Sequence, residues 1–317
     1  MTKILITGGS GFVGRHLVNE LLAGGETDLH ITSLSATADM PAEVTVHALD
    51  LNDGQAVENL IKTLQPEQIF HLASLASVGF SFSEPKTVLM NNFSLTVNLL
   101  ESIRVFSPQS KVLLISSADI YLKSQSHNQL DENTPLATVN PYAASKASQD
   151  LVAQAYVKSF ALKIVIARPF NHIGPGQATG FVTSDFARQI ALAELHPDQR
   201  VIKVGNLEAK RDFTAVYDMV RAYVLLMEKG EAGEIYNIGS GKSISIQSAL
   251  DQLVALADTE IKVEVDPEKI RPIDIAEIVC NNHKIVSLGW KPQVALEKVL
   301  AEILIDWRAR VKIESKP

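Results

Sequence analysis

The first half of this chain alternates short apolar runs with longer amphipathic stretches, and this order restricts the folds it can adopt. Runs typical of buried strands stand at residues 3–8, 29–34, 44–51, 68–74, 111–117 and 163–170. Between them, residues 12–23, residues 56–64 and a long segment ending at Phe106 carry apolar residues at helical spacing. Apolar runs separated by helices are typical of a parallel sheet covered on both faces, and crossovers of this length favour a doubly wound order. We therefore expect an α/β fold built on a doubly wound parallel sheet.

The pattern of residues changes after Pro169 and divides the chain into two halves. Residues 171–180 (NHIGPGQATG) are rich in turn formers, and the remainder mixes helices with short strands. We expect a first domain over residues 1–168 and a smaller C-terminal α/β domain over residues 169–317. Part of residues 212–238 is expected to pack back on the first domain.

Composition narrows the classes of partner. The 317 residues carry a net charge of −7 and no long basic block, which argues against nucleic acid or an anionic membrane as a partner. Cys280 is the only cysteine, so no internal disulfide forms, and a reducing compartment suits the chain. The sequence shows no leader-like segment and no apolar run of about eighteen residues. We expect a soluble, cytoplasmic protein.

A glycine-rich segment at residues 6–14 (ITGGSGFVG) follows the first strand and opens the first helix. In this context Gly8, Gly11 and Gly14 allow a tight turn, close approach of the backbone to a pyrophosphate, and close helix–strand packing. The free N–H groups and the dipole at the helix N-terminus favour the same anion. The segment predicts a dinucleotide-binding loop, with a purely structural glycine turn as the alternative.

The choice between NAD(H) and NADP(H) stays open from the sequence. An acid at the end of the second strand would bind the ribose 2′-hydroxyl, whereas an arginine would accept a 2′-phosphate. Residues 31–35 (ITSLS) contain neither. Asp50, which closes the next strand, is placed to contact the adenine.

Polar groups from two separate segments are predicted to meet at the carboxyl edge of the sheet, where ligands bind in such folds. Ser116, Ser117 and Asp119 end a buried strand. Tyr142 and Lys146 stand four residues apart at the start of the next helix, so their side chains share one face. Alone, this pair would be an ordinary surface pair. After a cofactor loop and a strand-end serine, it indicates a catalytic group.

This order of motifs resembles the extended short-chain dehydrogenase/reductase family, the NAD-dependent epimerases and dehydratases, over nearly the whole chain. The resemblance implies a Rossmann-type fold in which the first domain binds the dinucleotide and the second binds a nucleotide sugar. It implies that Tyr142 exchanges a proton with the substrate oxygen and that Ser117 hydrogen-bonds this oxygen. Lys146 would lower the pKa of the tyrosine and bind the nicotinamide ribose. The implied cofactor-binding residues are Gly8, Gly11, Phe12, Val13, Gly14, Asp50, Leu51, Leu72, Ala73, Ser74, Asn92, Tyr142, Lys146 and Pro169.

Two positions beyond Ser117 bear on the choice of reaction. Asp119 stands where dehydratases of this family carry an acid used in water elimination; its other interpretation is a loop aspartate that caps a turn. Some of these dehydratases have two adjacent acids, whereas here the neighbour is Ala118. Leu122 stands where the family usually has glycine.

The second half resembles the GDP-sugar branch of the family, above all its GDP-6-deoxy-D-mannose reductases. The matching segments are residues 167–177, 180–190, 204–213, 270–274, 289–292 and 296–307. A diphosphate is bound best by guanidinium and amide donors. The implied substrate-binding residues are Asn171, Val182, Lys203, Gly205, Arg211 and Arg271, with a surface ion pair as the alternative for either arginine. Because no His/Cys cluster has ligand spacing, we expect no metal site.

The leading hypothesis from this resemblance is reduction, by NADPH or NADH, of the C4 keto group of GDP-4-keto-6-deoxy-D-mannose to GDP-D-rhamnose. The alternatives are a GDP-mannose 4,6-dehydratase, which needs Asp119 as an acid/base, and a nucleotide-sugar epimerase. A regulatory protein that binds nucleotides without turnover is a fourth interpretation.

The resemblance also implies a homodimer. Its interface would form from two long helices, at residues 88–106 and residues 142–160. The apolar positions that fit either such an interface or an internal core are Leu95, Leu99, Leu151 and Val152.

Overall fold

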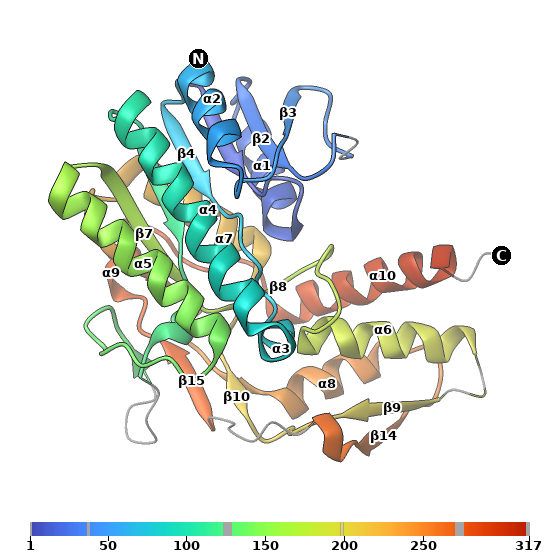
Figure 1. Ribbon diagram of the computed structural model, residues 1–317. Coiled ribbons are helices and arrows are strands. Elements are labelled where there is room, and N and C mark those ends of the chain that lie inside the picture. Colours follow the sequence, from blue (N-terminus) through green and yellow to red (C-terminus); the bar gives the residue numbers. More distant parts are fainter. Residues whose placement is uncertain are drawn as a thin grey trace.

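The computed structural model in Figure 1 describes residues 2–36, 39–122, 129–196, 198, 200–269 and 276–314. A seven-stranded sheet forms the centre of one lobe, and every strand pairing in it is parallel. In spatial order its strands are β12 (Ile235–Ile238), β7 (Lys163–Pro169), β5 (Lys111–Ile115), β4 (Gln68–His71), β1 (Ile4–Thr7), β2 (Leu29–Ser33) and β3 (Val44–Ala48).

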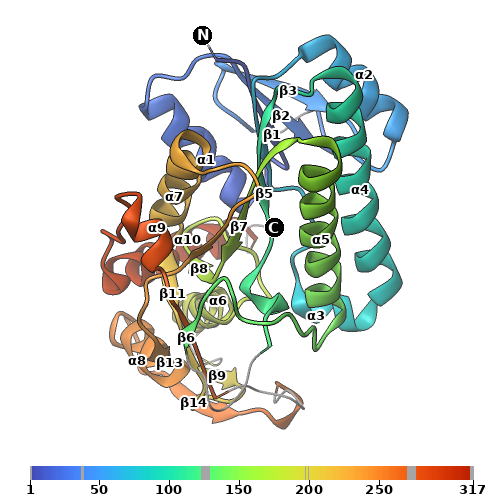
Figure 2. The same ribbon diagram turned by 90° about the vertical axis from the view of Figure 1, so that its left-hand side faces the viewer.

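Helices cover both faces of this sheet, as Figure 2 shows. Successive side chains of a strand point to opposite faces, so the apolar run of β1 serves two cores. Ile4 and Ile6 lie in the core with α1 (Phe12–Ala23), α7 (Val216–Lys229) and α9 (His283–Ser287), whereas Leu5 lies in the core on the other face. That other face carries α2 (Gly54–Leu64), α4 (Pro85–Phe106) and α5 (Pro141–Phe160). The predicted doubly wound α/β fold is confirmed.

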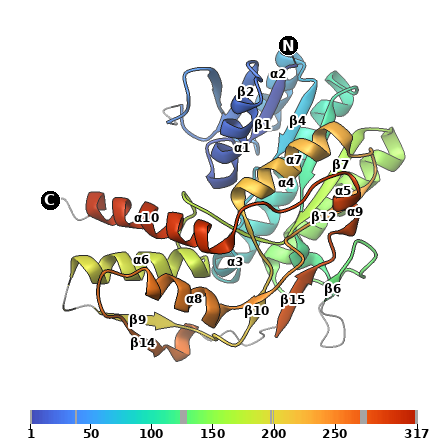
Figure 3. The ribbon, with the colours of Figure 1, turned by 180° about the vertical axis from the view of Figure 1, so that it is seen from behind.

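A second lobe with its own apolar core contains α6 (Val182–Leu195), α8 (Ile246–Ala255) and α10 (Leu296–Glu314), seen from behind in Figure 3. Its short strands form three small sheets. They are β13 (Ile244–Ser245), β10 (Lys210–Arg211), β15 (Glu277–Cys280) and β6 (Gln129–Leu130) in one, β8 (Asn171–Ile173) with β11 (Phe213–Ala215), and β9 (Val201–Val204) with β14 (Lys262–Val265). The remaining elements are α3 (Val78–Ser83) and the 3-10 turns η1 (Ala118–Ile120) and η2 (Pro267–Lys269).

The chain crosses between the lobes more than once. Residues of the second half supply α7, which packs on α1, and β12, which pairs with β7 at the edge of the large sheet. In the part of the chain that the structure describes, no helix is long and apolar enough to cross a membrane. Over the same residues, no cluster of three His, Cys, Asp or Glu side chains is placed to hold a metal ion.

Candidate active site

The glycine turn between β1 and α1 brings the backbone close to its neighbours. Gly8 has φ +69°, a left-handed conformation that favours glycine, and its N–H donates to Thr32 Oγ1 at 3.2 Å. Gly14 has no room for a side chain, because a Cβ there would lie 2.5 Å from the carbonyl oxygen of Gly9. The turn therefore has the tight geometry and the close helix packing that a dinucleotide loop requires.

A cleft of about 1350 Å³ lies between the two lobes, at the carboxyl ends of the strands. Since β1 has β2 on one side and β4 on the other, the glycine turn sits where the strand order reverses, the usual ligand position in such sheets. The predicted cofactor-binding residues that line this cleft are Gly8, Gly11, Phe12, Val13, Gly14, Asp50, Leu51, Leu72, Ala73, Ser74, Tyr142, Lys146 and Pro169.

Asn92, which was also predicted to bind the cofactor, is not among the residues that line the cleft, and its cofactor contact stays a prediction. Its side chain is fully buried and ties three segments together. The side-chain oxygen accepts from the N–H of Leu75 at 2.7 Å, and the amide nitrogen donates to Ser145 Oγ at 2.9 Å. Asn92 therefore holds the segment after β4 against α5, behind the cleft wall.

The start of α5 is fixed by two features of its sequence. Asn140 caps the helix by accepting from the N–H of Ala143 at 2.8 Å, and Pro141 follows in the first turn, where a missing N–H costs nothing. This cap sets the direction of the helix, so that Tyr142 and Lys146, one turn apart, both line the cleft.

Ser117 and Asp119 reach Tyr142 from the end of β5. The hydroxyl of Ser117 lies close enough to the phenol of Tyr142 to affect its pKa, and it accepts from the N–H of Asp119 at 3.1 Å. Burial raises the pKa of Tyr142, the carboxylate of Asp119 raises it further, and the nearby hydroxyl of Ser117 opposes both. The sequence led us to expect a pKa lowered by Lys146. In this structure, burial and the Asp119 carboxylate dominate, and the phenol keeps its proton.

Lys146 is almost completely buried, with 3% of its surface exposed. Its ammonium group donates to the carbonyl oxygen of Ile115 at 2.6 Å, which attaches α5 to the end of β5. Burial lowers the pKa of Lys146 to about 7, and the carboxylate of Asp150 opposes this shift. The lysine is therefore poised to gain or lose its charge near neutral pH.

Leu122 follows this turn without backbone strain, although the family usually has glycine there. Among the described residues, only Gln65 and Ala161 are non-glycine positions with positive φ, so Leu122 needs no left-handed conformation. Its N–H donates to the carbonyl oxygen of Pro135 at 2.7 Å.

The sugar-side residues line the far part of the same cleft. These are Asn171, Val182, Lys203, Gly205 and Arg211. A Cβ on Gly205 would lie 2.6 Å from the carbonyl oxygen of Lys269, so no larger residue fits there without a shift. Arg271 lies outside the residues that the structure describes.

Two buried polar atoms in the cleft wall have no partner in the part of the chain that the structure describes, one on Ser116, which the sequence placed at this edge of the sheet, and one on Gln177, which it did not single out. Ser116 Oγ and Gln177 Oε1 have no hydrogen-bond partner among the described residues, and both side chains line the cleft. Buried polar groups are normally paired, so such atoms fit a polar ligand that completes them. The strand-end position of Ser116 was the signal that placed it at this edge of the sheet. The turn-rich segment around Gln177 carries no comparable signal.

Comparison with known proteins identifies the family to which the chain belongs. The sequence model of the GDP-mannose 4,6 dehydratase family matches residues 5–303. The chain belongs to this family. A curated relative, the GDP-6-deoxy-D-mannose reductase of Pseudomonas aeruginosa, is 32% identical over 98% of this chain and 99% of its own length.

Solved structures of similar proteins agree with the membership of this dehydratase family. The structure of RMD from Pseudomonas aeruginosa complexed with NADPH has a TM-score of 0.86 and 30% identity, over 98% of this chain and all of that one. The Thermus thermophilus UDP-glucose 4-epimerase complex with NAD has a TM-score of 0.87 and 28% identity, over 97% and 99%. The predicted relationship to nucleotide-sugar enzymes of the extended short-chain type is confirmed.

Proposed function

We propose that this protein reduces the C4 keto group of GDP-4-keto-6-deoxy-D-mannose to GDP-D-rhamnose, with NADPH or NADH as reductant. The observation that carries the proposal is one cleft lined by the glycine turn, by the side chains of Ser117, Tyr142 and Lys146, and by the basic residues Lys203 and Arg211. The similarity of nearly the whole chain to a GDP-6-deoxy-D-mannose reductase supports this substrate over other nucleotide sugars.

The residues of the cleft have distinct parts in this reaction. Ser117 hydrogen-bonds the keto oxygen and fixes its position. Tyr142 gives its proton to the oxygen as negative charge develops there, and its raised pKa keeps that proton in place at neutral pH until then. Lys146 provides positive charge one helical turn away as the phenolate forms. Lys203 and Arg211 bind the diphosphate, and Asn171 donates an amide hydrogen bond on the same side.

Two features of the dinucleotide site suit this ligand. The glycines of the turn have no side chains that would keep a pyrophosphate away from the backbone, and the buried hydroxyl of Ser116 has no hydrogen-bond partner among the described residues. When bound, the reduced nicotinamide supplies the hydride for the keto carbon. The complex of the Pseudomonas relative with NADPH favours the phosphorylated cofactor. The absence of a carboxylate from residues 31–35 agrees with this preference, since no acid there repels a 2′-phosphate.

A direct assay tests the function. Purified protein incubated with GDP-4-keto-6-deoxy-D-mannose and NADPH should lose nicotinamide absorbance and form a GDP-sugar two hydrogens heavier by mass spectrometry. The dTDP-linked 4-keto-6-deoxy sugar serves as the substrate control and should react more slowly. Flat absorbance with both NADPH and NADH would overturn the proposal.

A GDP-mannose 4,6-dehydratase is the second candidate, favoured by one observation. The carboxylate of Asp119 lies close enough to Tyr142 to raise the pKa of the phenol, so an acid/base suited to water elimination stands beside the tyrosine. Feeding GDP-mannose without any reductant separates the two reactions. Formation of the keto sugar under these conditions would favour dehydration.

We further propose that the two parts of the chain on either side of residue 168 bind different ligands. Residues 1–168 bind the dinucleotide, and residues 169–317 bind the sugar nucleotide. Support comes from the separate apolar core of the second lobe and from the side chains that each lobe sends into the cleft.

A homodimer formed through α4 and α5 also belongs to the proposal. Leu95 and Leu99 are buried in the core of the chain itself and are not available to a partner. Met90 and Phe93 on α4 and Leu151 on α5 are exposed instead, by 58%, 41% and 54%. Exposed apolar side chains on two long helices fit an interface. Analytical ultracentrifugation should show a dimer that Leu151→Glu dissociates.

A further inference from the structure

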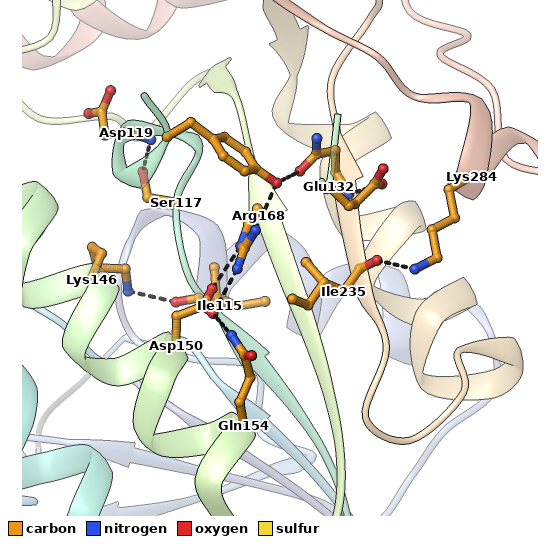
Figure 4. A network of polar contacts seen from close by, with 12 residues as sticks. Ile115, Ser117, Asp119, Glu132, Lys146, Asp150, Gln154, Arg168, Ile235 and Lys284 are labelled. Atoms are coloured by element: carbon orange, nitrogen blue, oxygen red, sulfur yellow. Dashed lines mark hydrogen bonds and ion pairs between the residues drawn. The ribbon is translucent and has the colours of Figure 1, made fainter. Parts of the chain in front are cut away.

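A buried ion pair lies behind the catalytic face of α5. Asp150, one helical turn after Lys146, accepts two hydrogen bonds from Arg168 at the end of β7, at 2.8 Å and 2.9 Å (Figure 4). The side chains of Arg168 and Asp150 are only 3% and 0% exposed. Gln154, one turn further along α5, donates to the same carboxylate at 2.6 Å.

The network continues from Arg168 to the segment after β5 that carries Ser117 and Asp119. The guanidinium donates to the hydroxyl of Tyr121 at 3.0 Å and lies 5.0 Å from the centre of its ring. Tyr121 follows directly after η1, the turn that contains Asp119, and donates to Asn237 on β12 at 2.6 Å. Asn237 in turn donates its backbone N–H to Glu132 at 2.8 Å. Strands β7 and β12, the segments that carry Tyr121 and Glu132, and α5 are thus tied together behind the cleft.

Stability alone does not account for such a pair. Removing two charges from water costs more than their attraction returns in many buried pairs, and apolar residues of similar size often stabilise a fold as well or better. A buried aspartate one turn from a buried lysine has a second effect, since its charge acts on the ammonium group through a low-dielectric interior.

Resting on the proposed function, we propose that Asp150 is a positioning residue that holds Lys146 in its charged form, and that Arg168 fixes the Asp150 carboxylate in the place where it does so. Neither residue lines the cleft, so each acts through Lys146 and not on the substrate. The effect of Asp150 on Lys146 opposes the effect of burial, which otherwise drives the lysine toward its neutral form.

The groups around Lys146 support this assignment. On β4, His71 is fully buried, and burial together with the charge of Lys146 lowers its pKa to about 3, so this histidine adds no charge of its own near neutral pH. On α5, Tyr142 is kept protonated by burial and by Asp119. On α7, the phenol of Tyr223, which lies near Tyr142, is neutral too, because burial raises its pKa. On α4, Asn92 and Thr96, which hydrogen-bond Ser145 and Gln149 on either side of Lys146 in α5, are uncharged. Asp150 is thus the described carboxylate that acts on the ammonium group.

The pH profile of the full-length protein tests the proposal. Activity should fall as the pH rises through the pKa of Lys146, because the neutral amine no longer provides positive charge. Asp150→Asn removes the stabilising carboxylate at nearly constant volume, so the alkaline limb of kcat/KM should move to lower pH by about one unit. Asp150→Glu keeps the charge and should leave the limb in place.

A second readout needs no turnover. In protein labelled with 13C at the lysine Cε atoms, the resonance lost in Lys146→Met is that of Lys146, and its titration should move to lower pH in Asp150→Asn. If the unpaired Arg168 prevents folding of this variant, the double variant Asp150→Asn/Arg168→Met removes both charges and should show a smaller shift in the same direction.

The matched control is the bidentate pair between Arg308 and Glu194 in the second lobe, at 2.8 Å and 2.7 Å. Glu194→Gln breaks a similar pair far from Lys146 and should move neither the pH limb nor the resonance. A folded Asp150→Asn protein with both titrations unchanged would overturn the inference. Because the resonance is read without substrate, that result is distinct from failure of the proposed reaction, which the wild-type assay reports.

Discussion

The two walls of the cleft are built by different means. On the large-sheet side, Lys146, Ser116 and Ser117 are almost completely buried and sit on strand ends and a capped helix. On the second-lobe side, Lys203 and Asn171 are exposed and Arg211 is half-buried. Buried groups are held in place before a ligand arrives, whereas exposed cations stay hydrated and mobile until they bind one. The first wall is suited to chemistry, which depends on orientation, and the second to binding of a charged ligand.

Loss of the phenol on the first wall should have the largest effect. Tyr142→Phe removes the proton donor and should lower kcat by about 10²–10⁴-fold, while NADPH binding, followed by fluorescence, stays close to wild type. Tyr156→Phe is the matched control, since Tyr156 lies on the same helix and donates to Glu101, away from the cleft. Normal turnover in the Tyr142→Phe variant would remove Tyr142 from the mechanism.

A methyl group in the glycine turn should come next. In Gly14→Ala the new Cβ would meet the carbonyl oxygens of Gly9 and Gly8 at 2.5 Å and 2.6 Å, so α1 must shift. We expect a loss of about 1–3 kcal/mol in unfolding free energy by urea titration, with weaker NADPH binding. Gly24→Ala at the other end of α1, whose closest Cβ contact is 3.3 Å, should cost less on both measures. Equal losses in the two variants would contradict the close-packing argument.

A charge removed from the second wall should change binding more than chemistry. Lys203→Ala should raise KM for the GDP-sugar about tenfold with little change in kcat, because a diphosphate contact made equally in ground and transition states is uniform binding. Lys158→Ala removes an exposed lysine from the outer end of α5 and should change neither constant. A fall in kcat with unchanged KM would assign Lys203 to the chemical step and break the contrast between the walls.

The smallest effect should be a pH slope of stability from Lys146. Its pKa is lowered from the model-peptide value of 10.5 to about 7 in the fold. Between these values the unfolded chain binds a proton that the folded protein lacks, so this group makes the unfolding free energy rise with pH. The slope stays below about 1.4 kcal/mol per pH unit. Denaturant titrations at pH 7 and pH 9 should show a smaller rise in Lys146→Met than in wild type. Identical slopes would mean that the lysine keeps its charge throughout.

Sequence reasoning recovered the large sheet because apolar periodicity determines its burial on both faces, and α1 begins and ends at the predicted residues. It also brought Ser117, Asp119, Tyr142 and Lys146 to one edge, since the carboxyl ends of parallel strands meet there. Asn92 shows where such reasoning ends. An asparagine on a helix next to a cleft can face a ligand or a neighbouring segment, and only the packing of α4 against α5 decides that it holds Leu75 and Ser145.

The pKa of Tyr142 was misjudged for a related reason. The spacing of Tyr142 and Lys146 shows that they share a helix face. The pKa of the phenol, however, also depends on its burial and on where η1, after β5, places the carboxylate of Asp119. The network through Arg168 was equally hidden, because its members come from segments more than one hundred residues apart, as Tyr121 and Asn237 do.

The late position of β12 and α7 in the chain has a consequence for biosynthesis. A ribosome that has released only the first 168 residues has made neither the strand that pairs with β7 nor the helix whose Met219 and Tyr223 cover the sheet. The nascent first lobe would then present a bare strand edge and an uncovered apolar face until residue 238 emerges. Both lobes are thus expected to reach their final form together, near the end of synthesis.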